Sequence, residues 1–455
     1  MRYFSRLQAF RGRWHVSPIA IRALLLQAAP FPSPESDMTR VLALRDARLY
    51  LAGQALSIFG DTALWLAAGI WVKTLTGSNT AAGLVFFAIS LPLVLAPFAG
   101  LLVDRVRRRP LLIATNLATG TMVLALLAVH DRGDVWLVYL VMLVYGIAYA
   151  VLGSGQSALL TLLLPEELLA YGNGALLTIR QGLRLVAPLA GAGLFAWRGG
   201  GFVAVVDAVT FLVAAATLAR VRVAEQPPEP VKRRWRAELA AGMRHVARTV
   251  DLRQMVTAAA VTVVVFGFSE TLVFAVVDRG LQRPPSFLGV LLTVQGVAGL
   301  LGGLTAAPLI RRVGEGCLAG AGMAMVAVAS PLLAFSSPTA VFLGVGLFGG
   351  SMPWIVVSAS TLLQRRTPPH LQGRVCSALD TLVGAPQTVA IALGAVLVAV
   401  VDYRALLVLL AVAAACAGGW LLTRREQWPR PAEPAALVLT EQAGRRELVG
   451  AGAPR

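Results

Sequence analysis

The stretch Gly100-Leu101-Leu102-Val103-Asp104-Arg105-Val106-Arg107-Arg108-Arg109 lies between two long apolar runs, 81–102 and 111–129. It contains a small residue, one carboxylate and four guanidinium groups, and the next helix is expected to begin near Pro110, because proline suits a first helical turn. This pattern predicts a short basic loop between two membrane-spanning helices. At the least, such a loop fixes the orientation of the chain in the membrane.

The composition indicates a membrane protein. Of the 455 residues, 57% are hydrophobic and 14% are charged, whereas soluble domains have about 25% charged residues. The net charge of +17 would fit a nucleic-acid-binding protein. The basic residues fall mostly in loops between apolar runs, however, so we interpret them as topology signals and expect a lipid bilayer, not a nucleic acid, as partner.

Twelve apolar segments are close to the length of about 20 residues that crosses a bilayer. They predict an all-α membrane protein with twelve transmembrane helices. The segments are 49–72, 81–103, 111–129, 135–163, 172–196, 201–221, 255–277, 287–310, 317–335, 339–363, 375–401 and 404–422.

One long connector divides these segments into six and six. It contains Pro227, Pro228 and Pro230 and the basic run 232–236, and its second part, 235–250, has the apolar spacing of a helix on the membrane surface. We therefore expect a disordered amino-terminal tail over 1–45, a six-helix bundle over 46–221, a linker over 222–253, a second six-helix bundle over 254–424 and a disordered tail over 425–455.

The loops predict the orientation of the chain. If the amino terminus is cytoplasmic, seventeen basic residues fall in cytoplasmic loops and six in external loops. Cytoplasmic loops of membrane proteins carry the excess of Lys and Arg. Both termini are therefore expected in the cytoplasm.

The two halves have similar motifs in the same order. Phe59-Gly60-Asp61 in the first segment parallels Phe266-Gly267 and Glu270 in the seventh, and Gly100 parallels Gly303. Proline-containing loops at 164–168 and 367–371 each precede the fifth segment of their half. Parallel repeats joined by a long loop are typical of transporters that bind substrate between the halves.

The basic loop resembles one of the major facilitator superfamily, where Gly and three residues precede Asp-Arg/Lys, one residue, Gly and two basic residues. Gly100, Asp104, Arg105 and Arg108 match, while Arg107 replaces the second Gly. The resemblance implies two pseudo-symmetric six-helix bundles and a conformational latch formed by the four matching residues. The alternative for this loop is a purely orienting role.

Further motifs narrow the resemblance to the branch that contains macrolide-efflux proteins and the enterobactin exporter. They lie at 165–174, 184–191, 206–212 and 373–375. The second is similar to the antiporter motif through Pro188 and Gly191, but Ala187 replaces its first Gly, which weakens the inference of antiport. The resemblance implies an exporter.

Two acidic residues are candidates for proton coupling. Asp61 lies about twelve residues into the first segment, and Glu270 occupies an equivalent depth in the seventh. A carboxyl group in the apolar membrane is costly and normally faces an interior cavity, where it can carry a proton. The alternative is a structural pair with a nearby Arg, Ser or Thr.

Other polar residues lie within the fifth and later segments. Arg180 and Arg184 share a helix face and either neutralise Asp61 or attract an anionic substrate, and Gln181 is a candidate cavity donor. Asp207 and Asp380 are expected to cap or pair at helix contacts, and Asp380 is also a candidate for the cavity.

No constellation typical of an enzyme, a metal site or a nucleotide cofactor occurs, so we expect neither catalysis nor a cofactor. The sequence predicts a monomeric secondary active transporter of the plasma (inner) membrane that exports amphipathic small molecules by alternating access and proton antiport. Two alternatives stay open. One is uptake or uncoupled movement of a metabolite; the other is a non-transporting membrane scaffold or sensor.

Overall fold

The chain is almost entirely helical in the computed structural model, which describes residues 34–95, 106–223 and 235–428. Its helices are α3 Pro34–Ala43, α4 Arg45–Thr76, α5 Asn79–Ser90, α7 Arg108–Leu124, α8 Val135–Leu163, α9 Leu169–Arg220, α10 Trp235–Arg248, α11 Val250–Ala275, α12 Leu288–Val313, α13 Glu315–Leu332, α14 Pro338–Arg366, α15 Pro369–Val400 and α16 Tyr403–Leu422.

Among the described residues, ten helices are long and apolar enough to cross a membrane. The fifth and sixth expected segments correspond to two helices that share the label α9. They are separated by a kink at Gly199, where a φ of 76° and a ψ of −180° turn the chain. The second expected segment is described over α5 and the 3₁₀ turn Leu91–Leu95.

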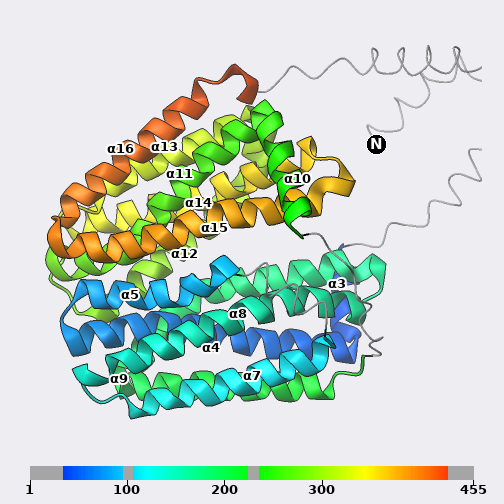
Figure 1. Ribbon diagram of the computed structural model, residues 1–455, viewed down its shortest axis with the longest axis vertical. Helices are drawn as coiled ribbons and strands as arrows, with labels where there is room; N and C mark the ends of the chain where they lie inside the picture. Colours follow the sequence, from blue (N-terminus) through cyan, green and yellow to red (C-terminus); the bar gives the residue numbers. More distant parts are fainter. Residues whose placement is uncertain (1–33, 96–105, 224–234, 429–455) are drawn as a thin grey trace, which may run out of the picture.

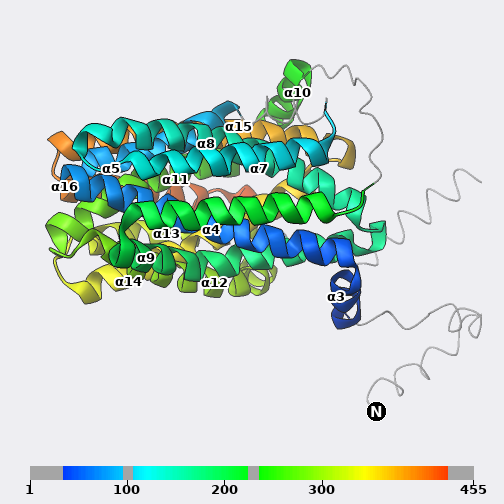
Figure 2. The ribbon, with the colours of Figure 1, turned by 90° about the horizontal axis from the view of Figure 1, so that it is seen from below.

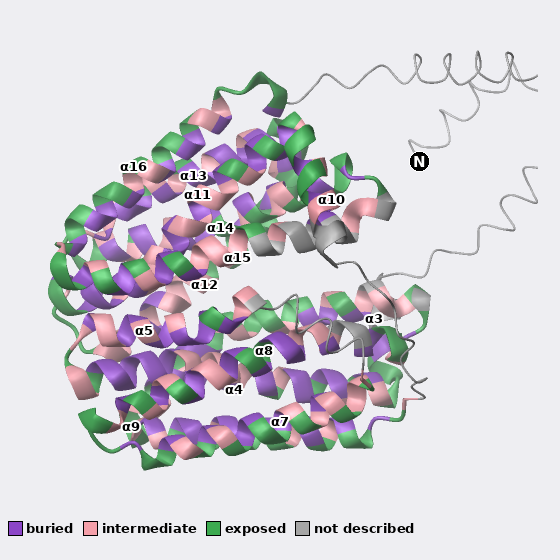
Figure 3. Ribbon diagram, in the orientation of Figure 1, coloured by how far each residue is buried: buried purple, intermediate pink, exposed green. Residues whose placement is uncertain are grey.

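The helices form two bundles, which Figure 1 shows one above the other. The amino-terminal half consists of α4, α5, α7, α8 and α9, and the carboxyl-terminal half consists of α11 to α16. One large cluster of buried apolar side chains lies within the amino-terminal half. The other is centred on the carboxyl-terminal half and crosses the boundary to include Leu66, Ile70, Ala82, Phe86 and Ala192. Between the halves, α9 contacts α12, and α5 contacts α11 and α15. Buried and exposed positions alternate along the peripheral helices α7 and α16, which therefore present one face to the bundle (Figure 3).

The bundle has two ends, the Lys73 end and the Arg109 end. At the Lys73 end lie the carboxyl end of α4 and the amino end of α5; at the Arg109 end lie the amino ends of α4 and α7 and the carboxyl end of α9. Figure 2 shows α3 extending beyond the Arg109 end.

The expected surface helix of the linker is present as α10. It packs on α11 and α15, and His245 Nε2 hydrogen-bonds to the Arg366 carbonyl oxygen at 3.2 Å. The expected tail over 1–45 differs from the structure at its end, because Pro34–Ala43 forms α3 and α4 begins at Arg45. Contacts of α3 with α4 and α9 explain this helix. Residues 1–33 and 429–455 lie outside the described chain.

Candidate functional site

Asp61 lies in the middle of α4 and faces α8. The Tyr145 hydroxyl donates a hydrogen bond of 2.5 Å to Asp61 Oδ1. Beside this bond is a cavity of about 20 Å³ with an almost entirely apolar lining, to which Leu64, Ile89, Leu93 and Met142 contribute. Asp61 therefore has a fixed hydrogen-bond donor in otherwise apolar surroundings.

Arg180 supplies a positive charge to this site from the first segment of α9. Its Nη2 donates to Gln156 Oε1 at 3.0 Å, and its charge attracts the Asp61 carboxylate. The Tyr50 hydroxyl holds the same glutamine residue through its backbone oxygen at 3.1 Å. Arg180 is exposed, and among the described residues no ion pair joins it to Asp61, so both functions expected for Arg180 stay predictions.

Asp207 approaches Asp61 from the second segment of α9. The approach depends on Gly60, where a Cβ atom would overlap the side chains of Asp207 and Thr210. Small residues allow two helices to pack this closely in a membrane. Asp207 is fully buried, and Thr210 Oγ1 lies 3.4 Å from its Oδ1. Two carboxyl groups thus lie together inside one half.

Glu270 has a different environment from Asp61. It is half-buried on α11, and the Arg184 guanidinium of the opposite half attracts its carboxylate. Arg184 is itself exposed. The two arginines thus lie near different acidic residues, Arg180 near Asp61 within its own half and Arg184 near Glu270 across the boundary between the halves.

The antiporter-like motif lies where α9 packs against α4 and α12. A Cβ atom at Gly191 would lie 2.6 Å from the Ala63 carbonyl oxygen, so only glycine fits against α4 at this point. Pro188 cannot donate a backbone hydrogen bond inside the helix. Near this interruption, Thr293 Oγ1 of the opposite half lies 3.2 Å from the Leu185 carbonyl oxygen and 2.9 Å from the Gly289 carbonyl oxygen of its own helix.

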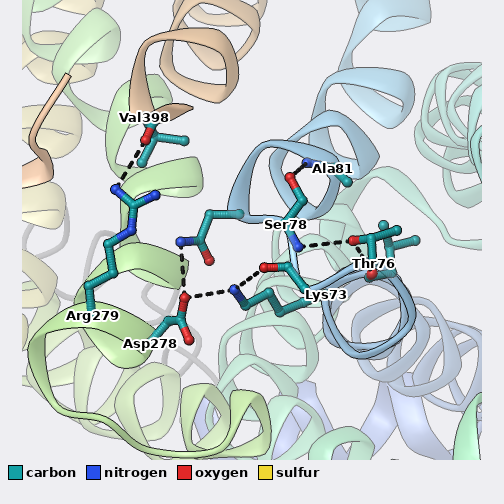
Figure 4. Close-up of polar contacts among 10 residues, drawn as sticks. Lys73, Thr76, Ser78, Ala81, Asp278, Arg279 and Val398 are labelled. Atoms are coloured by element: carbon teal, nitrogen blue, oxygen red, sulfur yellow. Dashed lines mark hydrogen bonds and ion pairs between the residues drawn. The ribbon is translucent and has the colours of Figure 1, made fainter. Parts of the chain in front are cut away.

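A polar clamp joins the halves at the Lys73 end (Figure 4). Lys73 Nζ lies 2.7 Å from Asp278 Oδ2 and also donates to the Gly77 carbonyl oxygen at 2.8 Å. Asn79 Nδ2 donates to the same Asp278 oxygen at 3.2 Å. Asp278 lies in a π turn, Val276–Gly280, and the adjacent Arg279 donates to the Val398 carbonyl oxygen at 3.4 Å.

Sequence reasoning did not assign this clamp or the contact of Tyr145 with Asp61. The loop pattern counts Lys73 only as an external charge, although a lysine near the end of an apolar helix could have indicated a paired site. Its side chain is 7% exposed in the structure, against 45% for Asp278. Tyr145 lies within an apolar run, so the sequence offers no signal for its contact.

Several predicted residues are placed only in part. Gly100, Asp104 and Arg105 lie outside the described residues, and Arg108 is in the first turn of α7. Gln181 is exposed on α9, and Asp380 lies on α15. Arg109, which follows Arg108 in α7, donates to the Leu218 and Ala219 carbonyl oxygens at 2.9 and 2.6 Å and so caps the end of α9.

Comparison of the sequence with models of protein families identifies the family of this chain. The model described as Major Facilitator Superfamily matches residues 50–385 and, in a second match, residues 261–451. The chain belongs to the major facilitator superfamily. This is a superfamily of multi-pass membrane transporters, and the apolar helices of the chain agree with that membership.

Named efflux proteins are among the relatives of this superfamily member. Macrolide efflux protein A of Streptococcus pyogenes is 30% identical over 176 residues, which cover 38% of this chain and 43% of that protein. The match thus spans less than half of the relative. The "Putative bacilysin exporter BacE" of Bacillus subtilis is 25% identical over 375 residues, which cover 78% of this chain and 89% of that protein.

A solved structure confirms the fold independently. A bacterial homologue of the iron transporter ferroportin, in an inward-facing state, superposes with a TM-score of 0.64 at 17% identity and covers 84% of this chain and 99% of that chain. At this identity the likeness concerns the fold alone. The predicted all-α architecture and its superfamily are confirmed.

Proposed function

We propose that this transporter exports amphipathic small molecules by alternating access and is driven by proton antiport. The observation that carries the proposal is the Asp61 site, where a carboxyl group in mid-membrane contacts Tyr145, lies near Arg180 and borders a cavity of about 20 Å³. A carboxyl group in such surroundings can take up and release a proton. The efflux proteins among its relatives support the direction of transport.

We further infer that the structure represents a state closed at the Lys73 end and open towards the Arg109 end. The clamp of Lys73 and Asp278 supports closure at one end. Closer to mid-membrane, Thr388 Oγ1 lies 3.2 Å from the Ser90 carbonyl oxygen of the other half and 3.1 Å from the Gly384 carbonyl oxygen of its own helix. Arg184 supports an opening at the other end, because it faces Glu270 of the opposite half and yet is exposed.

The proposed location is the plasma (inner) membrane, with both termini and the Arg109 end in the cytoplasm. The excess of basic residues in the loops at this end supports the orientation. The latch expected at Gly100, Asp104, Arg105 and Arg108 would then lie on the cytoplasmic side, opposite the clamp. We propose that the transporter works as a monomer.

The test is export by purified protein in proteoliposomes, with and without an imposed pH gradient. A panel of amphipathic compounds that includes macrolides serves as substrate. We expect gradient-dependent export, and we expect Asp61→Asn to abolish the dependence while downhill exchange of substrate continues. Movement of substrate in the same direction as the protons would indicate uptake. If export by Asp61→Asn responds to the gradient as strongly as before, Asp61 is not the coupling residue. A scaffold or sensor would move no compound.

A further inference from the structure

We propose that Asp61 and Asp207 share one proton through the Tyr145 hydroxyl and form the coupling unit as a pair. This inference rests on the proposed function, because only a proton-driven transporter needs such a unit. It assigns to Asp207 a function in coupling, whereas the sequence indicated only a residue that caps or pairs at a helix contact.

The surroundings of Asp207 are those of a neutral carboxyl group. Its side chain is 0% exposed, and its buried Oδ2 atom has no hydrogen-bond partner among the described residues. Thr210 offers little to Oδ1, because its single hydroxyl proton already goes to the Asp207 carbonyl oxygen at 2.7 Å. An ionised carboxylate in such a place would have a large desolvation cost. We infer that Asp207 holds a proton in this conformation.

The charged and titratable neighbours of Asp207 come from two elements. On α4 the neighbour is Asp61, and on α8 it is Tyr145, with Tyr149 close to that tyrosine. The polar residues Asn116 and Thr119 on α7 are neutral, and each donates to a carbonyl oxygen of its own helix. The positive charge of Arg180 acts on Asp61. Asp61, not Asp207, therefore has the counter-charge.

Tyr145 lies beside Asp61 and against the turn of α9 that follows Asp207. Its hydroxyl donates to Asp61 Oδ1 at 2.5 Å. Its ring is held edge-on against Phe211, one turn after Asp207, with 5.7 Å between ring centroids. A tyrosine hydroxyl has one proton to donate and lone pairs to accept. Protonated Asp207 can therefore donate to Tyr145 while Tyr145 donates to Asp61.

This chain of groups allows one proton to move between the two carboxyl groups. When Tyr145 gives its proton to Asp61 and takes the proton of Asp207, Asp61 becomes the acid, Asp207 becomes the carboxylate and Tyr145 is unchanged. With Arg180 charged and one proton on the pair, the cluster is neutral. Release of that proton leaves one uncompensated negative charge in the bundle, which makes the doubly ionised state costly unless the transporter changes conformation or binds substrate.

Infrared titration of purified protein tests the shared proton without transport. All variants carry Glu270→Gln, so that this acid does not contribute. We expect a carboxylic-acid C=O band at neutral pH that disappears on alkaline titration. In Asp61→Asn the band should change frequency and persist at alkaline pH, because Asp207 has lost its partner. In Asp207→Asn the band should be absent at neutral pH, because Arg180 compensates the remaining carboxylate.

A matched control is Thr119→Val, which removes a buried hydroxyl on α7 that donates to its own helix at 2.7 Å. It should leave the band and its titration unchanged. The proposal is overturned if Asp61→Asn leaves the frequency and titration of the band unchanged, since Asp207 would then hold a proton alone. It is also overturned if the protein without further substitution shows no acid band, since both carboxyl groups would then be ionised.

Export in proteoliposomes gives the second readout. In Asp207→Asn, loss of a proton from Asp61 no longer creates a second carboxylate beside another, so the pH of half-maximal export should fall by about one unit. Tyr145→Phe should slow gradient-driven export at least tenfold without loss of folded protein. The expected infrared result without any antiport would refute the proposed function and keep the shared proton. Antiport that needs Asp61 but is insensitive to Asp207→Asn would support the proposed function and refute the shared proton.

Discussion

Asp61 and Glu270 occupy matching positions in the two halves, but their neighbours differ in a way that bears on their functions. Tyr145 and Arg180, the neighbours of Asp61, belong to the same half. The positive charge near Glu270 is Arg184 of the other half. A movement of one half against the other therefore leaves the Asp61 site intact and separates Glu270 from its counter-charge.

We predict that Glu270→Gln keeps the response of export to a pH gradient. The amide preserves the shape of the side chain and removes only an attraction across the boundary, so the maximal rate should fall less than tenfold, which corresponds to about 1.4 kcal/mol. Export measured in proteoliposomes beside Asp61→Asn checks the prediction. If Glu270→Gln abolishes the response and Asp61→Asn does not, the proton site lies in the second half.

We predict that the Asp104 carboxylate is needed for export, because it matches the acidic residue of the latch motif. Asp104→Asn removes the charge and keeps the shape, so a latch that exists in one conformational state would be weakened in that state alone. Export should fall severely while insertion into the membrane and expression stay near normal. Normal export by a well-expressed variant would leave the loop only its orienting function.

The sequence indicated some of these residues and not their partners. Asp61 and Arg180 were predictable because charges inside apolar segments are rare and costly. The contact with Tyr145 and the approach of Asp207 were not, because they depend on which helices are neighbours. Helical periodicity gives the face of one helix and carries no information about the helix packed against it.

At the scale of elements, α12 and α14 approach each other closely through glycine. A Cβ atom at Gly302 would lie 3.1 Å from the Gly350 Cα atom, and its nearest contact, the Gly350 carbonyl oxygen, is closer still. At the adjacent Gly303, no other atom lies within 4 Å of such a Cβ. Two neighbouring glycines on one helix thus have opposite surroundings.

We predict that Gly302→Val destabilises the carboxyl-terminal half by about 1–3 kcal/mol, the usual cost of overpacking a tight contact. Gly303→Ala is the matched control and should be neutral or stabilising by up to about 1 kcal/mol, because alanine favours a helix over glycine. Thermal unfolding in detergent measures both. Equal stability of the two variants would contradict the close approach of α12 and α14.

Element boundaries were predictable where they depend on local chemistry. The start of α7 at Arg108, beside Pro110, and the helix Trp235–Arg248 agree with the sequence-based expectations. The two helices that share the label α9 meet at Gly199, between the expected segments 172–196 and 201–221. Gly199 permits the positive φ at its turn, but two further glycines, Gly200 and Gly201, follow directly, so the sequence marks a turn without giving its position or direction.

For the whole molecule, we predict that the clamp of Lys73 and Asp278 holds the Lys73 end closed. Asp278→Asn leaves the buried Lys73 ammonium without its counter-ion and should weaken closure of the Lys73 end by about 1 kcal/mol, a value reduced for the exposure of Asp278. A cysteine at Ser90, which is buried between the halves, should then react about fivefold faster with an external maleimide.

The control for this experiment is Asp131→Asn, which changes an exposed acid whose hydrogen bond is to Gly133 of the same loop. It should not alter the reaction of the Ser90 cysteine. Exchange of the two charges, Lys73→Asp with Asp278→Lys, should restore slow labelling. If Asp278→Asn reacts no faster than the control, the ion pair does not hold the halves together.

The orientation of the molecule is tested with two exposed positions in a background that lacks Cys317, Cys376 and Cys416. Arg248→Cys lies at the Arg109 end and Arg132→Cys in the loop before α8. An impermeant thiol reagent added to intact cells should label the second and spare the first. The reverse pattern would invert the topology and, with it, the side on which the proposed latch lies.

One continuous helix, α4, joins the Asp61 site to the clamp at Lys73. Helix α4 runs without a break from Arg45 to Thr76 and carries both Asp61 and Lys73. At about 1.5 Å per residue, the two side chains are roughly 18 Å apart along its axis. A tilt or rotation of α4 that follows loading at Asp61 must therefore displace Lys73 as well. A change at the Asp61 site would then reach the Lys73 end through this one helix, without a chain of intermediate side-chain contacts.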